Sequence, residues 1–171
     1  YLQAPAIVGG AVTKAKEQAA EIERRDPLRG AMAHASVALD QEDFDGAEHH
    51  YRSAIAAFPD SVGPRYALGQ FFVRGEKYDQ AFAVFDSILA ARPHDLNALY
   101  LVGRTGAISG QRLGRAEQAL KDFLAQPPRP NTPRPAGAHW RLGMVYEKQG
   151  RKDLAAEEYR KSLAIDPEFK E

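Results

Sequence analysis

The sequence contains no cysteine, which excludes disulfide bonds and thiolate metal sites. Its 23 Lys and Arg residues balance 23 Asp and Glu residues, so no overall electric field favours nucleic acid or an anionic membrane as a partner. Its apolar runs are far shorter than the ~18 residues that a membrane-spanning helix needs. The 171 residues therefore fit one domain or one short solenoid with a buried core.

Motifs typical of active and cofactor sites are also missing. Neither G-x-x-x-x-G-K nor G-x-G-x-x-G occurs, so a phosphate-binding loop is not expected. His49 and His50 are adjacent, and on a helix their side chains diverge by about 100°, which prevents them from gripping one metal ion. We expect His34 to be packed, and His49, His50 and His94 to be exposed. The sequence predicts no catalytic residue, no cofactor, no metal site and no enzymatic activity.

A repeated pattern of small, large and turn-forming residues is the most informative feature present. The stretch from Ala136 to Phe169 has the spacing of two short helices joined by a turn. Its pattern residues are Leu142-Gly143, Tyr146, Ala155, Tyr159 and Pro167. The pattern resembles the tetratricopeptide repeat (TPR), a 34-residue helix–turn–helix unit with L-G-x-x-Y, then A-x-x-x-F/Y, then Pro.

The same pattern recurs upstream. We predict four repeats, over residues 28–61, 62–95, 96–130 and 136–169, with a one-residue insertion in the third. No single repeat can bury its apolar surface alone, so the units must stack. The resemblance therefore implies an all-α fold, a right-handed superhelical TPR solenoid.

Small residues recur where the two helices of a repeat would cross closely. These are Gly69, Gly103 and Gly143 in the first helix, and Ala47, Ala81, Ala116 and Ala155 in the second. Large residues at a fixed distance from them are expected to pack into neighbouring helices. They are Tyr51, Phe85, Leu120 and Tyr159.

Both ends of the sequence read as pieces of incomplete repeats. Residues 1–27 are predicted to form one repeat helix over Val12 to Arg25, preceded mostly by a loop over Tyr1 to Gly10. Residues 166–171 are predicted to begin another helix, with Asp166 as N-cap and Pro167 at the first helical position. We therefore expect a fragment of a longer protein.

Five prolines lie between Gln126 and Gly137, and they favour an extended conformation over a helix. We interpret this segment as an enlarged loop between the third and fourth repeats. The alternative is a Pro-x-x-P ligand for another domain.

In TPR proteins the first helix of each repeat, helix A, lines a concave ligand-binding groove. The resemblance carries this role to Met32, Tyr66, Gln70, Tyr100, Arg104, Trp140, Arg141 and Met144. Aromatic rings provide contact area at little entropic cost, and Arg offers forked hydrogen bonds to carboxylates or carbonyl groups. We predict a groove that binds a peptide or helix of a partner protein, with aromatic anchors flanked by polar contacts. The alternative is that the aromatic residues only pack against neighbouring helices.

The resemblance implies a non-catalytic protein–protein interaction scaffold or adaptor. Two alternatives are a self-associating solenoid whose groove is filled by its own missing segments, and the regulatory arm of a larger enzyme. The carboxylate clamp of chaperone-adaptor TPR domains is absent, because its positions hold Met32, Ser36, Ala67, Asn97 and Leu101. We expect a protein or peptide partner, no nucleic acid and no membrane insertion. The A-P-A-I-V-G-G segment resembles exported bacterial TPR proteins, which favours a periplasmic or exported protein over a cytoplasmic one.

Overall fold

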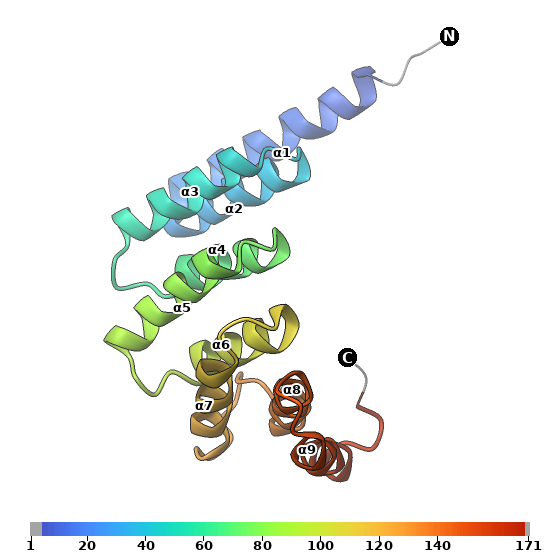
Figure 1. Ribbon diagram of the computed structural model, residues 1–171. Coiled ribbons are helices and arrows are strands. Elements are labelled where there is room, and N and C mark those ends of the chain that lie inside the picture. The colour runs from blue at the N-terminus through green and yellow to red at the C-terminus, as the bar shows by residue number, and fades with distance from the viewer. Residues whose placement is uncertain (1–4, 170–171) are drawn as a thin grey trace. The chain divides into compact units, whose positions relative to one another are not determined.

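The computed structural model describes residues 5–169, with side chains from residue 10 onward, and this part of the chain is helical without a strand (Figure 1). The helices are α1 (Pro5–Arg25), α2 (Pro27–Asp40), α3 (Phe44–Ala57), α4 (Gly63–Arg74), α5 (Tyr78–Ala91), α6 (Leu96–Ser109), α7 (Leu113–Leu124), α8 (Pro135–Lys148) and α9 (Lys152–Ile165). The predicted all-α class is confirmed. The chain divides between Phe71 and Phe72, inside α4, into two compact units.

In the first unit, α2 packs against both α1 and α3 (Figure 1). Asp26 caps α2 by accepting a hydrogen bond from the Arg29 N–H at 3.0 Å, and Asp43 caps α3 through the Gly46 N–H at 2.9 Å. These carboxylates satisfy N–H groups that have no partner within their own helix. The caps fix where α2 and α3 begin, and thereby which faces of the two helices meet.

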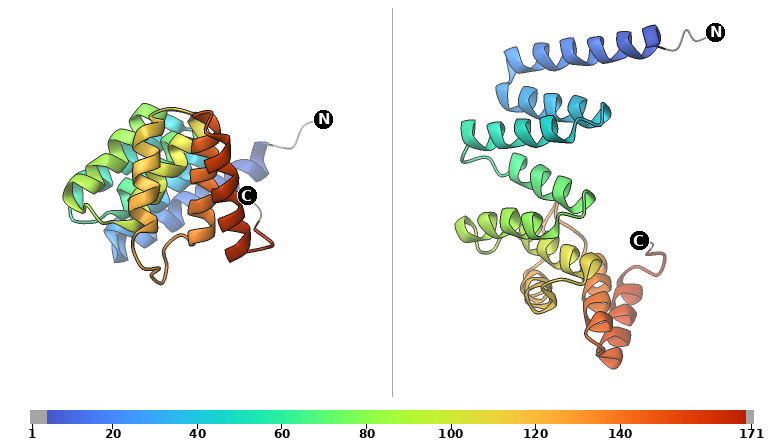
Figure 2. Two further views of the ribbon diagram at one scale, coloured as in Figure 1. Left: turned by 60° about the horizontal axis from the view of Figure 1, so that its bottom comes forward. Right: turned by 45° about the horizontal axis from the view of Figure 1, so that its top comes forward.

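In the second unit, α6 packs against α7 and α8 against α9, while α6 also contacts α8 (Figure 2). The core consists of large side chains that are almost completely buried. They include Phe82, Phe85, Ile88, Val102 and Leu120. Contact between α6 and α8 places the first helices of two successive repeats side by side.

Glycine in the first helix permits close packing of the second. A Cβ atom at Gly103 would overlap the Leu120 side chain, and one at Gly143 would lie 2.5 Å from Cε1 of Tyr159. Real carbon atoms do not approach this closely, so the large side chains occupy space that only glycine leaves open. The small and large positions of the repeat pattern therefore face each other.

Helix starts at proline account for two differences from the expected loops. α1 begins at Pro5, so the predicted loop is wrong from Pro5 to Gly10, and residues 1–4 lie outside the described part. α8 begins at Pro135, so the last three residues of the predicted Pro-rich loop are helical. Proline suits the first turn of a helix because its missing N–H would have no partner there.

The helix predicted to start at Asp166 is not seen in the described residues. Asp166 ends α9, and the Phe169 N–H donates to the Asp166 carbonyl at 3.0 Å, which forms a turn. Residues 170 and 171 lie outside the described part. The Pro–Glu pair thus redirects the chain after α9.

Replacing Gly103 with Ala should destabilise the protein, because the new methyl group overlaps the buried Leu120 side chain. We expect a loss of about 1–3 kcal/mol in the free energy of unfolding, the range for overpacked cores. Urea unfolding followed by circular dichroism measures this quantity.

Gly114→Ala is the matched control, because a Cβ atom at that α7 position has no neighbour within 4 Å. Alanine is the better helix former, so this variant should be as stable as the native chain or more so. Equal stability of the two variants would show that the helices do not depend on glycine at Gly103.

Candidate functional site

Equivalent positions of α6 and α8 hold four of the predicted groove residues. Tyr100 and Arg104 lie one turn apart on α6, and Trp140 and Met144 lie one turn apart on α8. Residues four positions apart share a helix face, and the two helices pack against each other. All four side chains are half-buried, so each retains surface for a further contact. We refer to these four residues as the helix-A patch.

The two aromatic rings of the patch pack against rings near or on the second helices of their repeats. The Tyr100 ring lies 5.8 Å from the Phe123 ring, and the Trp140 ring lies 4.8 Å from the Tyr159 ring, measured between centroids. A Cβ atom at Gly137 would be 3.2 Å from the Tyr100 hydroxyl, so α6 and α8 meet closely at this glycine. Tyr100 and Trp140 therefore have a dual role as packing residues and as partly exposed rings.

The two candidate arginines differ in accessibility. Arg104 is half-buried, whereas Arg141 is only 7% exposed. The Arg141 Nη1 group donates to the Met144 sulfur at 3.4 Å. Of the two guanidinium groups, that of Arg104 has the easier access to a ligand.

The turn after α9 places Phe169 against α8. The Phe169 ring centroid lies 5.8 Å from that of Trp140, and its ring atoms are 3.7–3.8 Å from a Cβ atom built at Gly137. Asp166 forms an ion pair with Arg134 at 2.9 Å, just before α8. A segment of the chain itself thus lies against the Trp140 side of the patch.

The remaining predicted groove residues belong to the first unit. Met32 and Tyr66 are half-buried, and Gln70 is exposed. Their role in ligand binding stays a prediction.

The family model of the tetratricopeptide repeat matches residues 32–95 and 106–168, which is well over half of the chain. The chain belongs to the tetratricopeptide repeat family. No curated protein matches the sequence significantly.

Solved TPR structures share the fold of this chain. MamA from AMB-1 aligns with a TM-score of 0.67 and 22% identity, over 95% of this chain and 86% of that chain. MamA from Desulfovibrio magneticus RS-1 aligns with a TM-score of 0.72 and 18% identity, over 96% and 91%. MamA from MSR-1 gives 0.67 and 21%, over 94% and 90%. At these identities the likeness establishes the TPR fold.

TPR repeats present extended binding surfaces, and the general function of this TPR chain is that of a protein-interaction scaffold. Within residues 5–169, no helix combines the length and the apolar character that crossing a membrane requires.

In the second unit, arginines at equivalent repeat positions link successive repeats. Arg112 precedes α7 and pairs with Asp79 of α5 at 2.8 Å. Arg151 holds the equivalent place before α9 and pairs with Glu117 of α7, also at 2.8 Å. Burial opposes ionisation of Glu117, but hydrogen bonds from Lys121 and Gln149 outweigh it and hold the pKa of this carboxyl below its usual value. These pairs fix the register between repeats and leave the helix-A patch uninvolved.

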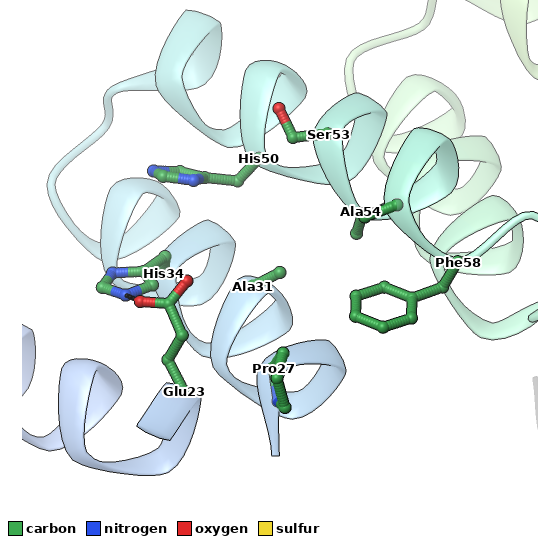
Figure 3. Close-up of a pocket in the computed structure, with 9 residues that line it drawn as sticks. Glu23, Pro27, Ala31, His34, His50, Ser53, Ala54 and Phe58 are labelled. Carbon is green, nitrogen blue, oxygen red and sulfur yellow. Dashed lines mark hydrogen bonds and ion pairs between the residues drawn. The ribbon is translucent and has the colours of Figure 1, made fainter. Parts of the chain in front are cut away.

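The first unit contains a pocket of about 380 Å³ between α1, α2 and α3 (Figure 3). One end is polar, with the His34 and His50 rings stacked at 5.5 Å and the His34 Nε2 atom 3.2 Å from a Glu23 carboxylate oxygen. The other end is apolar, lined by Pro27 and Phe58. Sequence reasoning missed this pocket, because its polar groups come from three helices that share no local motif.

The histidines differ partly from expectation. His49 and His94 are exposed as predicted, but His50 is half-buried in the pocket. His34 is also half-buried, bonded to Glu23 rather than enclosed in the core. Across the described residues, no three His, Asp or Glu side chains are grouped so that they could hold a metal ion.

His50 should make the first unit less stable in mild acid. Its pKa lies below the ordinary value of 6.5, first because of burial and then because of the nearby His34 and His49. The unfolded chain therefore takes up a proton more readily, and stability falls as the pH drops through and below 6.5. Asp43 and Glu23 oppose this effect without reversing it.

His50→Gln should accordingly reduce the loss of thermal stability between pH 7 and pH 5, measured as the change in Tm. His94→Gln, at an exposed position, is the control and should keep the native dependence. The explanation fails if both variants show the same change in Tm over this range.

Proposed function

We propose that this TPR protein is a non-catalytic scaffold or adaptor that binds a peptide or a helix of a partner protein through the helix-A patch of α6 and α8. The observation that carries the proposal is the partial burial that the four patch residues share. Tyr100, Arg104, Trp140 and Met144 occupy two equivalent positions on adjoining helices, and each is half-buried. Half-buried rings are held in place by the fold and still offer area to a ligand.

The chemistry of the patch favours a peptide over a small metabolite. Two large rings and a thioether provide apolar contact, and the Arg104 guanidinium can bind carboxylate or carbonyl oxygens. An extended or helical segment offers both groups at intervals that match successive helices. Met32, Tyr66 and Gln70 are proposed to contact a ligand on the first unit by themselves, and Arg141 is proposed to support the helix-A patch.

Arg104→Ala is the most direct test, because this half-buried side chain is not one of the buried core residues. Peptides are selected from a displayed random library against the native chain, and their affinities are measured by isothermal titration calorimetry. We expect Arg104→Ala to weaken binding roughly tenfold, the loss of one good charged hydrogen bond. Tyr100→Ala should weaken it further, with helicity checked by circular dichroism.

Arg160→Ala provides the control, since Arg160 is exposed on α9. It should leave the affinity unchanged. The proposal is contradicted if no peptide is enriched, or if the selected peptides bind the Arg104 variant as tightly as the native chain.

A further inference from the structure

We propose that residues Asp166–Phe169 cover the Trp140 side of the helix-A patch, and that the partner peptide displaces them with the same chemistry: an acidic residue followed three positions later by an aromatic residue. This inference rests on the proposed function and adds to it the class of the ligand. It follows from how the segment is held.

The acidic end of the segment binds a basic group at the start of α8. An Asp166 carboxylate oxygen lies 2.9 Å from the Arg134 guanidinium. The Arg134 side chain is 74% exposed, so the same group is open to the carboxylate of another chain. Arg134 is therefore the acid-binding point of the surface.

The aromatic end packs on α8 three residues further along. Phe169 is half-buried, with its ring beside Trp140 and over the backbone at Gly137. A longer side chain at Gly137 would enter the space between the Phe169 ring and the Tyr100 hydroxyl. Glycine at this position thus leaves room for an aromatic ring directly on the helix.

The turn sets the spacing between the two contacts. The Phe169 N–H donates to the Asp166 carbonyl at 3.0 Å, which brings the first and fourth residues of the turn close together. A peptide with an acid and an aromatic residue at this separation has the spacing that this turn requires. Pro167 at the second position restricts the backbone to values that suit it.

The described contacts hold the segment only weakly, so displacement is feasible. The Arg134–Asp166 pair is open to water on its Arg134 side, and ion pairs open to water contribute little net stability. One half-buried ring adds a modest contact. A competing peptide gains both contacts and can also reach Tyr100 and Arg104.

Trp140 is the only tryptophan of the chain, so its fluorescence reports on this site alone. Phe169→Ala should shift the Trp140 emission to the red, because the indole ring becomes more exposed to water. The probe is the synthetic peptide Ile-Asp-Pro-Glu-Phe-Lys, with blocked ends, which repeats the sequence of residues 165–170. In the Phe169→Ala variant it should reverse the red shift and bind roughly tenfold more tightly than it binds the native chain, since its competitor is gone.

Phe44→Ala is the matched variant, because Phe44 is 57% exposed on α3 and lies in the other unit. It should behave as the native chain does. A control peptide with Asn for Asp and Ala for Phe should not reverse the shift. Arg134→Ala, combined with Phe169→Ala, should weaken binding of the acidic peptide.

Equal affinity of the probe for the native and Phe169→Ala chains would overturn the inference, as would equal binding of the control peptide. Loss of the native emission on dilution would also overturn it, because Phe169 would then come from a second copy of the chain. If Arg104→Ala weakens the affinity of the library peptides but Phe169→Ala leaves it unchanged, this inference is contradicted and the proposed function is not. Failure of the library selection itself would instead contradict the proposed function.

Discussion

The close approach of the two helices within a repeat is the constraint on which the second unit depends. Gly103 faces the buried Leu120, and Gly143 faces Tyr159, in space that a single methyl group would fill. Because these contacts fix the distance between helix A and its partner, they also fix where the half-buried Tyr100 and Trp140 rings lie beside the second helix of each repeat. The binding surface is therefore a consequence of the packing pattern.

The same rings serve stability and recognition. Tyr100 packs against Phe123 and Trp140 packs against Tyr159, yet both remain half-buried. A ring that is already ordered loses little entropy when a ligand covers it. Ion pairs such as Arg151 with Glu117 set the register between repeats. They involve none of the four helix-A patch residues.

The repeat pattern predicts the second unit well because its signals are local and periodic. Glycine, alanine and large residues recur at one spacing. Gly103 and Gly143 lie at close helix contacts, and Ala81, Ala116 and Ala155 are buried. Contacts made by turns and by chain reversal lack such a signal. The packing of Phe169 on Trp140 depends on the turn at Asp166, where the same Asp–Pro pair equally suits the start of a helix. The loop predicted at Pro5 was wrong for the same reason, since proline occurs both in loops and at helix starts. The His34–His50 contact joins two helices, and no repeated sequence spacing predicts it.

The central claim is that partners bind the face formed by α6 and α8. Hydrogen–deuterium exchange of the chain, with and without a saturating selected peptide, tests it most directly. The account predicts slower amide exchange in residues 96–109 and 135–148, with little change in α7 and in the first unit's pocket. Protection concentrated in α7, or around His34 and His50, would contradict it and place the binding surface elsewhere.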